Sequence, residues 1–208
     1  MIDHLALNSG GLKSREDSHA GMVMNSSQDL IARARTGDNE AFRLLFERYA
    51  RPILVFTYNL VGRYDVAEEL TQETFVRAYS NLKDLCDEAK FSSWLFGISR
   101  NVVREWIRSR VRGQTSSADA ISIPEQQHAI NLSPADQLME KELNGAIFMA
   151  VQSLDEDRRV VFALKIFHGS SYQEIVDITG FSMAKVKTEL HRARVEMRRK
   201  LRGYLERK

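Results

Sequence analysis

Apolar residues recur at spacings of three and four along most of the chain after residue 28. This is the period of an amphipathic helix, whereas no segment shows the strict alternation of a half-buried strand. The helical pattern is interrupted once, between residues 112 and 134. We therefore predict an all-α fold of two small helical domains, over residues 29–111 and 135–208.

Two segments lack this pattern. Residues 1–28 are polar and rich in Ser, Gly and Asn, which is typical of a disordered tail. In residues 112–134 a run of small polar residues has no apolar face, and Pro124 and Pro134 interrupt any helix. We expect the N-terminal segment to be a disordered tail and the internal segment to be a flexible linker between the domains.

Residues with capping and breaking chemistry divide the first domain into helices. Asp38 can cap a helix that follows it, and Pro52 is expected to start a new turn or to kink that helix. Gly62 is a plausible C-cap. The segment from Asp65 has the spacing of a capping box and predicts a helix that ends near Asn81.

The last predicted helix of this domain, residues 91–111, has one apolar and one basic face. Arg100, Arg104 and Arg108 are four residues apart and align opposite the apolar face, with Asn101 beside them. A row of guanidinium groups suits a nucleic-acid backbone, although a solvated helix face with salt bridges has the same composition. We expect the two tryptophans, Trp94 and Trp106, to pack in the core rather than to stack on bases.

The second domain contains the pattern of a helix-turn-helix. Ser171 and Glu174 have capping-box spacing, Gly180 can form the turn, and Ser182 can cap a longer basic helix. The N-terminal half of such a helix meets base edges in the major groove. The other interpretation is a basic helix that closes an ordinary three-helix bundle. The candidates for base contact are Ser182, Lys185, Lys187, Glu189, His191 and Arg192, and those for phosphate contact are Arg194 and Arg198.

Composition narrows the class of protein. The net charge is only +2, but the basic residues gather in the two helices just described, which favours a polyanionic partner. No run of about 20 apolar residues could span a membrane, and no secretion signal is evident, so we expect a cytoplasmic location. The single cysteine, Cys86, cannot form an internal disulfide, and no cluster has metal-ligand spacing. Sequence motifs of common enzyme classes are missing, so we expect no catalytic residues, no metal and no cofactor.

Taken together and in this order, these pieces resemble the sigma factors of bacterial RNA polymerase, in the sigma-70 family and its extracytoplasmic-function (ECF) subfamily. The segments that carry the resemblance are AEELTQETFVRA at residues 67–78, FSSWLFGISRN at residues 91–101, SYQEI at residues 171–175, and LHRAR at residues 190–194. Each segment is weak alone, and their joint occurrence is specific.

The resemblance implies a role for each domain. The first domain would dock on the β′ coiled coil of core RNA polymerase through Glu69, Gln72, Glu73 and Arg77. It would also recognise and melt the minus-ten promoter element through the arginine helix and a preceding loop. That loop would receive a flipped base, and its lining is expected to include Asp84, Asp87 and Lys90.

By the same resemblance, the second domain would bind the minus-thirty-five element of promoter DNA and the β flap of the polymerase. Control by a separate anti-sigma factor is also implied. The sequence departs from the family pattern at Glu189, where a basic or small polar residue is common, and at Phe181 and Met183 near the turn. These departures concern which promoter is read.

Two other classes of function remain to be weighed. A one-component regulator could carry the same helix-turn-helix, but the first domain offers no evident ligand pocket. Such a regulator would form a homodimer on palindromic DNA, whereas a sigma factor would copurify with polymerase subunits. A pure interaction scaffold would not respond to loss of the basic residues.

Overall fold

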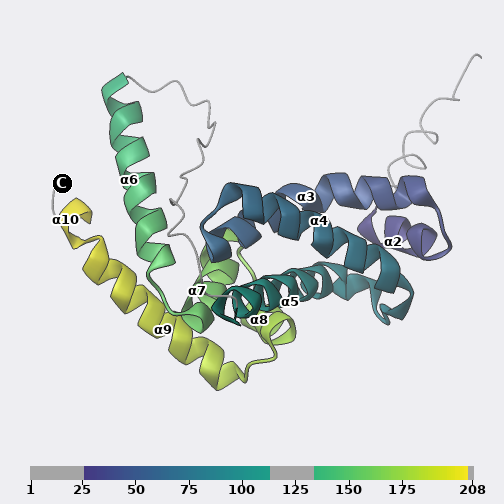
Figure 1. Ribbon diagram of the computed structural model, residues 1–208. Coiled ribbons are helices and arrows are strands. Elements are labelled where there is room, and N and C mark those ends of the chain that lie inside the picture. Colours follow the sequence, from purple (N-terminus) through teal and green to yellow (C-terminus); the bar gives the residue numbers. More distant parts are fainter. Residues whose placement is uncertain (1–25, 113–133, 206–208) are drawn as a thin grey trace, which may run out of the picture.

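The computed structural model describes residues 26–112 and 134–205, and these residues form helices and no strand (Figure 1). The predicted all-α class is therefore confirmed. The predicted linker and most of the predicted tail lie outside the described residues. The first helix starts at Ser27, so the last residues assigned to the tail are already helical.

The described residues form an N-terminal unit, residues 26–112, and a C-terminal unit, residues 134–205. The N-terminal unit consists of α2 (Ser27–Arg35), α3 (Asn39–Val61), α4 (Tyr64–Asn81), the short 3-10 turns η1 (Leu82–Asp84) and η2 (Glu88–Lys90), and α5 (Phe91–Arg112). The C-terminal unit consists of α6 (Pro134–Gln152), α7 (Glu156–Phe162), the π-helical turn η3 (Ala163–Phe167), α8 (Tyr172–Thr179), α9 (Met183–Lys200) and α10 (Arg202–Leu205).

Local capping chemistry was predicted correctly at both ends of α3. The Asp38 carboxylate accepts hydrogen bonds from the backbone N–H groups of Glu40 and Ala41. Gly62 ends the helix with a φ of 77°, a left-handed conformation that side chains disfavour. The new turn that Pro52 was expected to start is not found, because α3 continues through this residue. Burial of Ile53 one residue later holds the helix where local propensity alone would end it.

The capping box expected at Asp65 is wrong. Helix α4 starts one residue earlier, at Tyr64, and Arg63 occupies the N-cap position without a side-chain cap. The Asp65 carboxylate instead forms an ion pair with Arg63, at 2.6 Å. The predicted end of this helix at Asn81 is confirmed.

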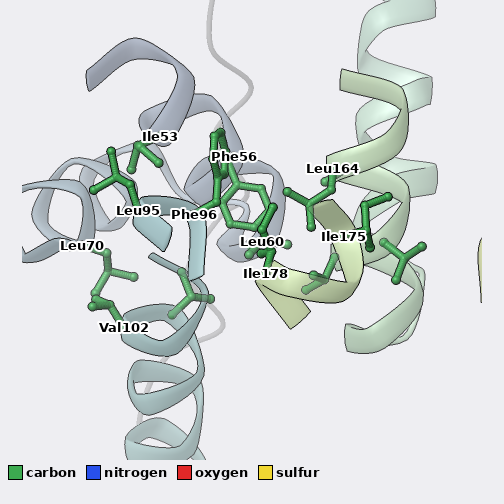
Figure 2. Close-up of a cluster of buried hydrophobic side chains, with 14 of the residues drawn as sticks. Ile53, Phe56, Leu60, Leu70, Leu95, Phe96, Val102, Leu164, Ile175 and Ile178 are labelled. Atoms are coloured by element: carbon green, nitrogen blue, oxygen red, sulfur yellow. The ribbon is translucent and has the colours of Figure 1, made fainter. Parts of the chain in front are cut away.

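The two units share one continuous hydrophobic core, which the sequence did not predict. Phe56 and Leu60 of α3 and Phe96 of α5 lie beside Leu164 and Ile178 of the C-terminal unit (Figure 2). Helices α5 and α8 lie side by side in Figure 1, and the C-terminal part of α6 packs on α3, where the Phe148 ring stacks on Tyr58. Helix α9 extends away from the N-terminal unit. The helix-turn-helix is thus packed against the helix that carries the arginine row.

Polar contacts reinforce this packing. One Nη of Arg159 donates to the Leu60 carbonyl at 2.7 Å, and the other donates to the carbonyls of Gln152 and Leu154. The Gln152 amide donates to the Asn59 carbonyl at 2.9 Å. Arg159 therefore ties the start of α7 to the end of α3.

Candidate nucleic-acid interface

The turn between α8 and α9 has the predicted local chemistry. The Ser171 hydroxyl accepts from the Glu174 N–H while the Glu174 carboxylate accepts from the Ser171 N–H, which completes a capping box. Gly180 ends α8 with a φ of 69°. The Ser182 hydroxyl accepts from the Lys185 N–H at 3.2 Å and caps α9. A short helix, a glycine turn and a capped longer helix are confirmed, which is the geometry of a helix-turn-helix. Because Ser182 is engaged as the cap, its hydroxyl has one fewer lone pair for DNA.

Helix α9 buries one face and exposes a basic stripe. Val186, Leu190, Ala193 and Met197 are buried, as predicted. On an adjacent face, four candidate residues recur at spacings of four, three and four and are exposed. None of the four forms a hydrogen bond or an ion pair with a residue that the structure describes. These residues, called the α9 stripe below, are Lys187, His191, Arg194 and Arg198.

The other flank of α9 is bound to α7. The guanidinium of Arg158 lies 3.2 Å from a carboxylate oxygen of Glu189 and 3.3 Å from one of Glu196. The other oxygen of Glu189 accepts from Arg192 at 3.1 Å. The side chain of Glu189 is only 13% exposed. This placement disfavours the prediction that Glu189 contacts base edges, because its carboxylate is bound to Arg158 of α7 and to Arg192 of α9 itself.

Two further candidates on α9 are engaged inside the protein. The Lys185 ammonium lies 2.7 Å from a carboxylate oxygen of Asp157 and 3.8 Å from the centroid of the Phe181 ring. Arg192 is 56% exposed despite its bond to Glu189. Of the two, Arg192 could swing toward DNA at little cost, whereas Lys185 would first have to leave two partners.

The C-terminal unit covers part of the arginine row on α5, so the residues of the row differ in exposure. Asn101 and Arg108 are exposed. Arg104 is partly exposed and lies 3.4 Å from Glu156 of α7. Arg100 is only 6% exposed, and its guanidinium carbon lies 5.1 Å from the Phe181 ring centroid.

Arg100 makes no hydrogen bond or ion pair with the residues that the structure describes, and its Nε is buried. Burial lowers its pKa, and the nearby positive charge of Arg104 lowers it further. The negative charges of Asp157 and Glu156 act on this pKa in the opposite direction, but neither carboxylate forms an ion pair with Arg100, and a buried guanidinium without such a pair is costly. The arginine row of α5 was expected to face solvent along its whole length. It does not, because the helix-turn-helix covers the side of α5 that carries Arg100.

The segment that precedes α5 lies at the protein surface. Asp84 ends η1, and Asp87 caps η2 by accepting from the Ala89 N–H at 3.0 Å. Lys90 is exposed and lies 3.8 Å from Asp177 of α8. Cys86, between them, is exposed.

The predicted docking residues lie on one face of α4. Glu69 and Gln72 are exposed, while Glu73 and Arg77 are half-buried. Arg77 binds Glu73 at 2.7 Å and Glu105 of α5 at 2.8 Å. Arg77 therefore links α4 to α5, and the freely available groups of this face are Glu69 and Gln72.

Some residues that shape the site were missed by sequence reasoning. Arg158 carries the ion pairs to α9, and His168 lies between the rings of Phe56 and Phe96, with centroid distances of 5.7 and 5.0 Å. The sequence feature that could have pointed to these contacts at the turn was Phe181, which departs from the family pattern. Trp94 and Trp106 are partly buried against the core, as predicted.

Within residues 26–112 and 134–205 there is no cluster of His, Cys, Asp or Glu that could hold a metal ion. None of the helices in that part of the chain is long and apolar enough to cross a membrane.

Both units match models of known protein families. The family model "Sigma-70 region 2" matches residues 45–113, and the model "Sigma-70, region 4" matches residues 144–197. Among curated relatives, the ECF RNA polymerase sigma factor SigW of Bacillus subtilis is 29% identical over 177 residues, which cover 83% of this chain and 95% of the relative. The ECF RNA polymerase sigma-E factor of Escherichia coli K12 is 29% identical over 187 residues, 88% of this chain and 97% of the relative.

Solved structures share the fold. CnrH in complex with the cytosolic domain of CnrY aligns with a TM-score of 0.60 at 23% identity, over 85% of this chain and 97% of that one. The sigma factor RpoE in complex with the anti-sigma factor NepR, from Bartonella quintana, aligns with a TM-score of 0.63 at 24% identity, over 77% and 96%.

Proposed function

Because this chain belongs to the sigma-70 family, as an RNA polymerase sigma factor of the ECF type, we propose which of its residues contact the polymerase and which contact the promoter. A sigma factor is a DNA-binding initiation factor and not an enzyme. We propose that residues 29–111 dock on core RNA polymerase and engage the minus-ten element, and that residues 135–208 engage the minus-thirty-five element. The cytoplasm, where core polymerase acts, is the proposed location.

The observation that carries this proposal is the α9 stripe. Four exposed side chains, three of them cationic, follow a capped turn at helical spacing and have no partner among the described residues. Such a surface is available to the DNA backbone and to base edges in the major groove. Lys187 and His191 lie toward the N-terminal half, where base contact is expected, and Arg194 and Arg198 follow toward phosphates.

For the minus-ten element we propose Arg100, Asn101, Arg104 and Arg108 of α5, together with Asp84, Asp87 and Lys90 of the preceding segment. Asn101 and Arg108 are exposed as they stand. For docking on the β′ coiled coil we propose Glu69, Gln72, Glu73 and Arg77. The exposed carboxylate of Glu69 supplies a charge that is not already paired within the described residues.

We also propose that an anti-sigma factor controls this chain and that the C-terminal unit touches the β flap. The support for the first is that similarly folded sigma factors were solved with CnrY and with the anti-sigma factor NepR. Their identity to this chain is too low to transfer a particular partner.

Copurification tests the proposed function. The tagged chain should retain the core polymerase subunits from a lysate of its own host, and a Glu69→Lys variant should retain less. The control is Glu47→Lys, a charge reversal at another exposed glutamate, on α3. A homodimer bound to palindromic DNA, with no polymerase subunits retained, would contradict the proposal and favour a one-component regulator.

A further inference from the structure

We propose that a cavity between α3, α5 and α7 is a binding site for a small organic anion, a carboxylate carried on an apolar ring. The cavity has a volume of about 260 Å³, and side chains of both units line it. Cavities that hold drug-sized ligands usually measure about 300–1,000 Å³, so this one suits a smaller molecule. Such a site is independent of the roles proposed above for individual residues in initiation.

Apolar side chains from the three helices form most of the lining. They are Leu60 and Val61 of α3, Val103, Trp106 and Ile107 of α5, and Val160 of α7. Trp106 is only partly buried against the core, so its ring keeps surface on which a ligand can pack. An apolar lining with a few polar groups is typical of small-molecule sites, and an aromatic wall favours an aromatic ligand.

The charged part of the lining has an excess of positive charge. It consists of three arginines, Arg100, Arg104 and Arg159, and one glutamate, Glu156. Arg104 lies 3.4 Å from the Glu156 carboxylate, which balances one of the cations. Arg159 donates its Nη groups to backbone carbonyls and to the Gln152 side chain, all of them uncharged acceptors. Two cations thus have no carboxylate partner among the lining residues, and the complementary ligand is an anion.

Arg100 supplies the donors that such an anion would bind. Its side chain is 6% exposed and forms no hydrogen bond or ion pair with the part of the chain that the structure describes. Of its nitrogens only Nε is fully enclosed, so the Nη groups are the donors that face the cavity. The Phe181 ring covers the flat face of the guanidinium and leaves these in-plane donors free. A carboxylate would accept from both of them and would form the ion pair that this buried cation lacks.

Binding can be followed at the two tryptophans of the chain. Trp106 lines the cavity and reports on it, whereas Trp94 is not among the lining residues and serves as an internal control. The probe is 2-naphthoate, a carboxylate on an apolar double ring. Its comparison compounds are 2-naphthamide, which has the ring without the charge, and acetate, which has the charge without the ring. Each is titrated into the full-length, ¹⁵N-labelled chain while the indole N–H signals, assigned with Trp94→Phe, are recorded.

Two substitutions with opposite expected effects test the role of charge. Arg100→Met removes the guanidinium and keeps a long side chain. It should raise the dissociation constant for 2-naphthoate about ten-fold or more, because hydrogen bonds to a charged group are lost. Glu156→Gln removes the carboxylate of the lining by an isosteric change at an exposed position. It should lower the dissociation constant several-fold, because Arg104 is then released to attract the anion.

A matched control separates a specific site from general attraction to a basic helix. Arg108 is exposed on the same helix as Arg100 and is not among the lining residues. Arg108→Met should therefore leave the dissociation constant for 2-naphthoate nearly unchanged. Thermal unfolding and the position of the Trp94 signal show for each variant that the fold is retained. If Arg100→Met does not fold, the direction of the change in Glu156→Gln decides.

We expect 2-naphthoate to shift the Trp106 signal in a saturable way and to leave the Trp94 signal in place. The amide and acetate should each bind about ten-fold more weakly or not at all. A Trp106 signal that does not respond to 2-naphthoate would overturn the proposal. So would an amide or acetate that binds as well as 2-naphthoate, an equal loss in Arg108→Met and Arg100→Met, or an affinity that does not rise in Glu156→Gln.

Discussion

The guanidinium carbon of Arg100 lies 5.1 Å from the centroid of the Phe181 ring, across the boundary between the two units. Arg100 comes from the helix proposed to bind the minus-ten element, and Phe181 from the turn of the helix-turn-helix. The contact therefore joins two surfaces that are proposed to bind different parts of a promoter. Its energetic weakness is that the buried Nε of Arg100 has no hydrogen-bond partner and the guanidinium forms no ion pair within the described residues.

Replacing Arg100 with methionine should not destabilise the isolated chain. The apolar side chain fills similar space without a buried charge, so the free energy of unfolding should stay the same or rise by about 1–4 kcal/mol. Chemical denaturation measures it, with Arg108→Met, an exposed change on the same helix, as the control. A loss of several kcal/mol in Arg100→Met alone would show that Arg100 has a stabilising partner.

Glu189 should be a structural residue rather than a reader of bases. Because Arg158 and Arg192 bind its carboxylate, Glu189→Gln should lower the free energy of unfolding by about 1 kcal/mol and leave the preferred minus-thirty-five sequence unchanged. In a double-mutant cycle with Arg158→Met, the coupling energy should be about 1 kcal/mol. Selection of bound sequences from a random pool would refute this view if Glu189→Gln changed the preferred bases.

The α9 stripe should account for part of the salt dependence of DNA binding. Arg194→Ala should weaken binding about equally on all sequences and reduce the slope of log K against log salt by about one, because one phosphate contact is lost. Titrations of the holoenzyme on duplex DNA at several salt concentrations give this slope. Arg43→Ala, a cation on α3 that is paired with Glu40, is the control and should leave the slope unchanged.

Acid should weaken the packing around His168. Burial lowers the pKa of this imidazole to about 4, from its usual 6.5, so the folded state favours the neutral form. The free energy of unfolding should therefore decrease as the pH falls from about 6.5 to about 4, and then level off. Between pH 7 and pH 5 the wild type should lose about 2 kcal/mol more than His168→Leu. Equal losses in the two proteins would mean that His168 is not buried between Phe56 and Phe96 in solution.

The sequence predicted those features that depend on neighbouring residues. The caps at Asp38, Ser171 and Ser182 and the left-handed glycines at Gly62 and Gly180 each need only a few residues of the right type. The buried face of α9 followed from helical periodicity alone. Such features can be read from a single sequence because their energies are local.

The features that were missed depend on contacts between distant segments. Pro52 continues a helix because packing outweighs its propensity, and Asp65 pairs with Arg63 instead of capping. Helical spacing correctly aligned Arg100 with Arg104, but it could not show that another unit covers that face. The ion pair between Glu189 and Arg158 was equally hidden, because the two residues lie 31 positions apart.

Run-off transcription tests the central claim most directly. Purified core RNA polymerase would be incubated with a pool of host genomic fragments, with and without this chain, and the 5′ ends of the transcripts would be sequenced. If the chain is a sigma factor, its addition should produce transcripts from a limited set of defined start points that share two upstream elements. Transcripts that begin at the same positions without it, or no defined start point on any template, would contradict the account.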